Sequence, residues 1–118
     1  MSCHPSTMTA LVVLFRNRPA LAGELLRLQG VAGAPAEAML DSARLASTSV
    51  AEVDLRQYEV DGVVLFGQEE SPDRVVVVEV QRSRDTDKRF SWPVYLAHLR
   101  ARHRCPVLLL VLAFGAGM

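Results

Sequence analysis

The chain has 118 residues, and half of them are hydrophobic. This size and composition predict one globular domain with a single core and exclude a disordered chain. The formal net charge is zero, yet residues 1–81 carry six basic and eleven acidic side chains, and residues 82–104 carry seven basic and two acidic ones. An acidic part that holds metal beside a basic part that holds phosphate would explain this distribution, and ordinary solvated faces explain it as well.

Helices are predicted in the N-terminal third of the chain, after a start over residues 1–7 that we expect to be disordered. The predicted helices cover Met8–Phe15, Pro19–Gln29 and Ala36–Leu45. Asn17 or Arg18 would cap the second helix, and Pro19 would lie in its first turn, where the missing N–H of proline is harmless.

Apolar, β-branched runs predict four strands. They cover Val50–Tyr58, Val60–Phe66, Arg74–Gln81 and Val107–Phe114. Residues 82–104 predict a helix that is either kinked at Pro93 or begins at Trp92 with Ser91 as its cap. A crossover through this helix would make the last strand parallel to the third. The order α-β-β-β-α-β predicts an α/β fold with a central mixed sheet flanked by helices.

Two cysteines, Cys3 and Cys105, are too few for a disulfide framework and fit a reducing cytoplasm. No signal peptide is evident, and the apolar run at residues 107–114 is far shorter than the roughly 20 residues that span a bilayer. We therefore expect a cytoplasmic protein without a membrane partner.

The polar turn at Gly67–Asp73 predicts the register of a hairpin. If Phe66 pairs with Arg74 across it, Asp61 pairs with Glu79, and directly opposed residues lie on one face with Cβ atoms about 4.5–5.5 Å apart. Two carboxylates that meet between buried strands need compensation by a cation, so a divalent-metal site is the first hypothesis. A slip of one residue would separate them, and two partly exposed acids at strand ends are the alternative.

The acid Asp61, followed by a strand that ends in Glu79-Val80-Gln81, resembles the signature of the PD-(D/E)XK nucleases. An ending with Gln in the Lys position is similar to the branch of recombination-promoting nucleases and putative transposases. The longer segment Glu79–Tyr95 resembles a group of uncharacterised actinobacterial proteins with this nuclease-like core. The resemblance covers about Leu11–Phe114 and implies a restriction-endonuclease-like core and a DNA endonuclease that uses Mg²⁺ or Mn²⁺. Those relatives generally continue beyond the last strand, so a C-terminal truncation stays open.

The resemblance implies that Asp61, Glu79 and the Val80 backbone carbonyl bind the metal ion. Gln81, which lies on the same face as Glu79 because side chains alternate along a strand, would orient the attacking water. Gln81 lacks the charge of the usual lysine, and Lys88, the only lysine, could supply it.

Further candidates lie on the predicted helices. Some nucleases of this fold place an additional acid near the metal on an early helix, where this chain has Glu24; a surface glutamate is the alternative. The candidate phosphate-binding residues are Arg82, Arg84, Arg89, Arg100 and Arg104. Trp92 and Tyr95 are one turn apart and either stack on bases or, in the favoured interpretation, pack the helix onto the sheet.

We therefore expect a single domain that binds DNA. Formation of a homodimer stays open. The alternative function is an inactive or truncated nuclease relative that binds a nucleic acid or a protein.

Overall fold

A four-stranded mixed sheet forms the centre of the computed structural model, which describes residues 7–46, 61–81 and 88–113. Along the chain the elements are α1 (Thr7–Asn17), α2 (Ala20–Leu28), the 3₁₀ helix η1 (Glu37–Ser42), β1 (Arg44–Leu45), β2 (Gly62–Gly67), β3 (Pro72–Gln81), α3 (Lys88–His103) and β4 (Val107–Ala113). The strand order is β1-β2-β3-β4. β2 is antiparallel to β1 and β3, whereas β4 is parallel to β3. The α/β class and the parallel last strand are thus confirmed.

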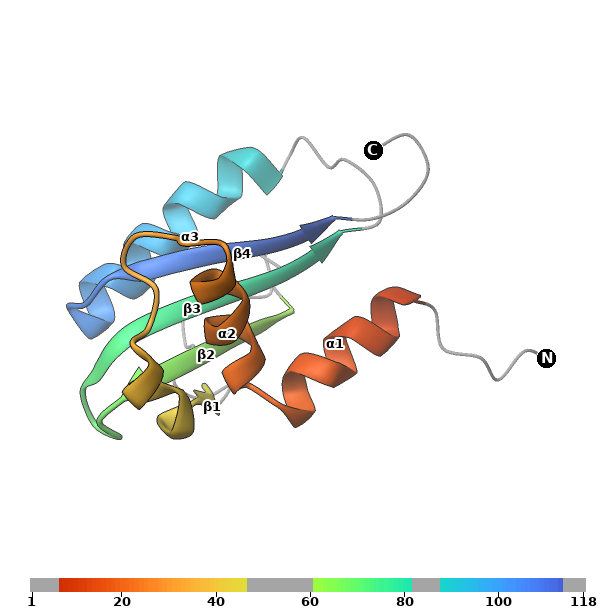
Figure 1. Ribbon diagram of the computed structural model, residues 1–118. Coiled ribbons are helices and arrows are strands. Elements are labelled where there is room, and N and C mark those ends of the chain that lie inside the picture. The colour runs from red at the N-terminus through yellow and green to blue at the C-terminus, as the bar shows by residue number, and fades with distance from the viewer. Residues whose placement is uncertain (1–6, 47–60, 82–87, 114–118) are drawn as a thin grey trace.

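The two faces of the sheet pack against different helices because the strand side chains alternate. On one face, α1, α2 and η1 cover the even-numbered residues of β2 and β3, and α2 crosses in front of the sheet in Figure 1. This core contains Phe15, Ala22, Leu26, Val64, Phe66, Val76, Val78, Val80 and Leu110. On the other face, α3 covers the odd-numbered residues. That second core contains Val63, Leu65, Val75, Val77, Tyr95 and Leu99.

The helix predicted over Ala36–Leu45 is wrong in its second half. A short 3₁₀ helix ends at Ser42, and Arg44 and Leu45 form strand β1 instead. Arg44 pairs with Leu65 of β2. Its guanidinium also donates hydrogen bonds to four backbone carbonyls, those of Ser42, Gly67, Gln68 and Glu69, at 2.6 to 3.1 Å. Tertiary pairing and this side chain therefore override the local preference for a helix.

Smaller differences concern the ends of the helices. α1 begins at Thr7, and the cap of α2 is Pro19 itself, without a side-chain cap. α3 begins at Lys88 and continues through Pro93, so of the two predicted alternatives the helix that starts at Trp92 is wrong. Arg104 follows the last helical residue with φ +53, the left-handed conformation that closes many helices. The predicted strand at residues 50–58 lies outside the described residues.

Candidate functional site

The hairpin of β2 and β3 has the register that the sequence predicts. Phe66 pairs with Arg74, and Gly62 pairs with Val78 at the other end of β2. Asp61 directly precedes β2, just outside the paired register, which ends with Gly62 opposite Val78. The Asp61 N–H donates to the Val78 carbonyl at 3.1 Å, which ties this residue to β3. The ladder ends at Gly62 and Val78, so the predicted pairing of Asp61 with Glu79 is not among its pairs, although Asp61 lies beside the β3 segment that contains Glu79.

The Asp61 carboxylate is anchored to the backbone of β3. Its Oδ2 accepts a hydrogen bond of 2.6 Å from the Val80 N–H. β2 begins only at Gly62, so the carboxylate takes the place of a strand carbonyl for this buried N–H. Asp61 thus lies beside the backbone of the Glu79–Gln81 segment, as the metal-site hypothesis requires, and it also has a structural role that the sequence did not reveal.

Glu79 is fully buried, with none of its surface exposed. It is the only charged side chain of the described residues that is buried to this degree. By alternation Glu79 shares the α3 face of the sheet with Val75 and Val77, and its neighbour on β4 is Val111. Burial of a carboxylate is costly unless other groups compensate it, so the complete burial of Glu79 makes its position one of the first places to look for a function.

Gln81 follows on the same face at the end of β3. Its residue is half-buried, but the amide Nε2 is closed to solvent and has no hydrogen-bond partner in the described part of the chain. Glu79 and Gln81 are therefore in the relative positions that the resemblance assigns to the second acid and the Lys substitute. Lys88 is the first residue of α3, which begins at the end of the sheet where β3 and β4 finish (Figure 1).

α3 covers the face of the sheet that carries the odd-numbered strand residues. Tyr95 is almost completely buried and packs with Val75 and Val77, so the expectation that it fastens the helix to the sheet is confirmed. Burial raises the pKa of the Tyr95 hydroxyl to about 12, because an apolar environment disfavours the phenolate. Trp92 lies one turn nearer to the start of α3 and is half-buried.

The structure does not bring Glu24 to the acid pair. Glu24 is on α2, which packs on the opposite face of the sheet. Its carboxylate accepts a 2.6 Å hydrogen bond from Arg18, and with Arg27 and Glu37 it lines a shallow depression between α2 and η1. This is the surface glutamate that the sequence analysis kept as the alternative.

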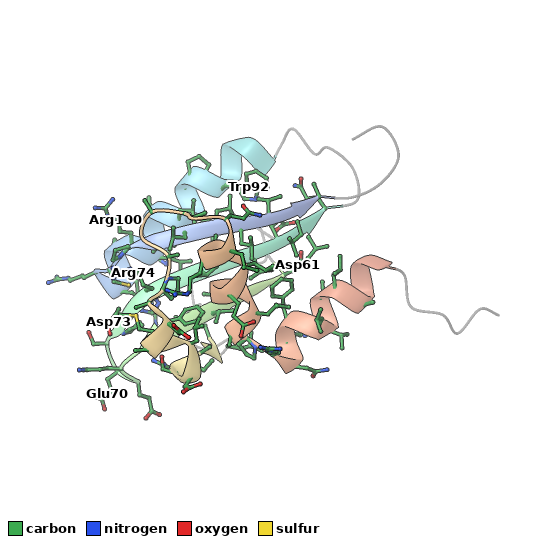
Figure 2. All side chains as sticks on the ribbon, viewed as in Figure 1. Asp61, Glu70, Asp73, Arg74, Trp92 and Arg100 are labelled. Atoms are coloured by element: carbon green, nitrogen blue, oxygen red, sulfur yellow. The ribbon has the colours of Figure 1, made fainter. Side chains whose placement is uncertain are left out.

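Two of the five predicted phosphate-binding arginines, Arg100 and Arg104, lie away from the acids. Arg100 and Arg104 are exposed near the C-terminal end of α3. This end leads into Val107, whose partner on β3 is Val75, four residues or about 13 Å before Glu79. In Figure 2, Arg100 lies at the left of the molecule and Asp61 near its middle, so the two side chains are well separated. Arg89 is in the first turn of α3, whereas Arg82 and Arg84 lie outside the described residues.

The donor chemistry of the acid pair fits a hard divalent cation. The described residues contain no group of three or more His, Cys, Asp or Glu side chains that could hold a metal ion. Mg²⁺ is nevertheless commonly bound through one or two carboxylates, with water and substrate oxygens as the remaining ligands. Asp61 and Glu79 provide two carboxylates at the same end of the hairpin, and only Oδ2 of Asp61 is used by Val80.

Comparison of the chain with protein-family models, with curated proteins and with solved structures gives no match. In the described ranges, no helix has the length and apolar character needed to cross a membrane.

Proposed function

We propose that this chain is a metal-dependent DNA endonuclease with a restriction-endonuclease-like core of the PD-(D/E)XK type. The observation that carries the proposal is the position of the Asp61 carboxylate beside the Glu79–Gln81 segment of β3, where it accepts a 2.6 Å hydrogen bond from the Val80 N–H. Gln81 follows Glu79 by two residues on the same face of β3. The antiparallel strands followed by α3 and the parallel β4 support the same core. The proposal combines this arrangement with the resemblance of the Glu79-Val80-Gln81 ending.

In this proposal each residue acts through the position that the hairpin gives it. Asp61, Glu79 and the Val80 carbonyl would hold Mg²⁺ or Mn²⁺. A divalent ion of this kind lowers the pKa of a bound water and neutralises charge on a phosphate. The Gln81 amide would orient the attacking water by hydrogen bonding, and Lys88, at the start of α3, would add the positive charge that Gln81 lacks.

Cleavage of supercoiled plasmid DNA tests the proposal. The wild type is compared with Asp61→Asn and Glu79→Gln, which remove one charge each and keep the side-chain shape. Glu24→Gln is the matched control, because it makes the same change on the opposite face of the sheet. We expect nicking that requires Mg²⁺ or Mn²⁺, that is lost in the first two variants and that persists in the control. Folded wild-type protein without activity, or equal activity in all four proteins, would contradict the assignment.

A second candidate is an inactive nuclease-like module that binds nucleic acid. The complete burial of Glu79 and the hydrogen bond of Asp61 to the Val80 N–H favour it, because both acids then have structural roles. Exposed Arg100 and Arg104 would make phosphate contacts. Binding of DNA without cleavage, weakened when both arginines are replaced by alanine, is the expected result for this candidate.

A further inference from the structure

The two edges of the sheet differ in length and in composition. β1 forms one edge with only two residues, one of which is the charged Arg44. β4 forms the other edge with seven apolar residues, and it pairs with β3 without a bulge (Figure 1). Soluble proteins usually protect an exposed edge with a short strand, a charge, a proline or a bulge, because unpaired backbone groups pair with strands of other molecules. The β4 strand has none of these protections.

The register of β4 shows which of its backbone groups face this edge. The Val75 N–H donates to the Pro106 carbonyl at 3.1 Å, and the parallel pairing continues from Val75 opposite Val107 to Gln81 opposite Ala113. In a parallel ladder, alternate residues of a strand direct both backbone groups to the same neighbour. The even-numbered residues of β4 therefore bond to β3, and the odd-numbered ones direct their N–H and C=O groups outward. Within the described ranges these outward groups make no hydrogen bond; they belong to Val107, Leu109, Val111 and Ala113.

The side chains of β4 are also only partly covered. Val76, Val77 and Val80 of the neighbouring β3 have no exposed surface, whereas Leu110 is the only buried residue of β4. The even-numbered side chains of β4 lie against the core under α1 and α2, and Val107 and Leu109 lie against the core under α3. A further strand beside β4 would therefore complete the burial of apolar side chains on both faces at once.

We propose that the partner of β4 is the same strand of a second copy of this chain, paired antiparallel around a two-fold axis at Leu110. In this register Leu109 is opposite Val111 of the second copy, and Val107 is opposite Ala113. All outward residues then form hydrogen-bonded pairs, in which the two residues exchange both N–H···O bonds. A two-fold axis at Leu109 or at Val111 would leave an outward residue of each copy beyond the end of the other strand.

The occupant of this edge is a second copy because the strand is self-complementary. A two-fold interface places the same surface against itself, so a charged residue near its centre would meet its own charge. With the axis at Leu110 every opposed pair is apolar, and Leu108 faces Leu112 on the side of α1 and α2. The net charge of zero lets two copies approach without overall repulsion. The inference goes beyond the proposed nuclease and does not depend on it, since it uses neither Asp61 nor Glu79.

Sedimentation velocity over a range of protein concentrations measures the oligomeric state. A pair of seven-residue strands is a small interface, so we expect a reversible dimer with a Kd of about 1–100 µM. Val111→Pro removes an outward N–H that the fold itself does not use, and proline is tolerated at such edge positions. Each copy then loses one hydrogen bond across the interface, so dimerisation should weaken by about tenfold or more.

Leu45→Pro is the matched control at the other edge of the sheet. The Ala46 N–H donates to the Val63 carbonyl, so by alternation the Leu45 N–H points away from β2. We expect this variant to dimerise like the wild type, and thermal melting should show that both variants are folded. If Val111→Pro does not fold, Ala113→Pro decides, because Ala113 is exposed and also directs its N–H outward.

Amide hydrogen exchange followed by NMR gives an independent readout in the wild type. The outward amides of Leu109 and Val111 should exchange more slowly as the protein concentration rises through the Kd, whereas those of Leu108 and Leu110, which bond to β3, should not respond. A protein that stays monomeric overturns the proposal, and so does a dimer that persists in Val111→Pro with outward amides that exchange at the monomer rate. Protected outward amides in a monomer would identify another segment of the same chain as the occupant and would also overturn it.

Discussion

Replacing Asp61 should separate its structural role from its proposed chemical one. In Asp61→Ala, the Val80 N–H loses its acceptor at 2.6 Å, and Val80 is completely buried, so water cannot take over. An unsatisfied buried donor that had a charged partner destabilises a protein by about 2–3 kcal/mol. In Asp61→Asn, the amide oxygen can still accept this bond, and only the extra strength of a charged acceptor, about 1 kcal/mol, is lost.

Thermal unfolding followed by circular dichroism measures this difference. For a chain of 118 residues, 1 kcal/mol corresponds to about 4 °C in Tm. We expect Asp61→Ala to melt about 8–12 °C below the wild type and Asp61→Asn about 4 °C below it. Equal Tm values for Asp61→Ala and the wild type would show that the hydrogen bond to Val80 contributes nothing. An equal loss in both variants would show that charge, and not the bond, is what stabilises the hairpin.

The same melts reveal metal binding without any reference to activity. A ligand that binds only the folded state adds about 2.7 kcal/mol at a concentration one hundred times its Kd. Mg²⁺ should therefore raise the Tm of the wild type and leave that of Asp61→Asn unchanged, because the variant keeps the fold and loses one of two carboxylates. A Tm rise of equal size in both proteins would place the metal elsewhere.

Four other positions give independent tests. Gly23→Ala should destabilise the fold by about 1–3 kcal/mol, because a Cβ there would lie 2.9 Å from Cζ of Phe66, and urea unfolding measures the loss. Arg44→Ala removes the donor to four backbone carbonyls and should lower the free energy of unfolding by about 2 kcal/mol in the same assay. An unchanged free energy would show that the turn between β2 and β3 does not depend on these hydrogen bonds. Arg104→Gly should raise the Tm by a few degrees, since glycine adopts φ +53 without strain. The pKa of Tyr95 is about 12 in the folded protein and 10.0 in the unfolded chain, so the neutral hydroxyl stabilises the fold fully below pH 10.0. This stabilisation is lost as the pH rises to about 12. Urea unfolding of Tyr95→Phe should no longer show this pH dependence.

Local sequence patterns were sufficient to predict strand pairing where the paired residues belong to one hairpin. The polar turn after Phe66 and the alternation of β3 predicted the pairing of Phe66 with Arg74, and with it the register as far as Gly62 and Val78. A strand register is determined by a few residues on either side of the turn, so the sequence contains the information. The parallel β4 followed from the need for a crossover helix between two buried strands.

Local patterns gave a wrong or undecided prediction where a residue interacts with another that lies far away along the chain. Arg44 and Leu45 read as the end of a helix, but they form a strand because β2 offers a free edge and the loop after Gly67 offers carbonyls to the Arg44 guanidinium. Glu24 has helical spacing that is compatible with either face of the sheet. Only the packing of α2 against the even-numbered strand residues places it away from the acid pair.

The sequence by itself therefore determined the α/β class and the hairpin register, because these depend on alternation and on one turn. Tertiary structure alone decided that Glu79 is completely buried, that the Asp61 carboxylate accepts the Val80 N–H, and that Arg100 lies at the end of α3 away from the acids. Burial and the choice of helix face arise when distant elements pack together, and no local pattern contains that geometry.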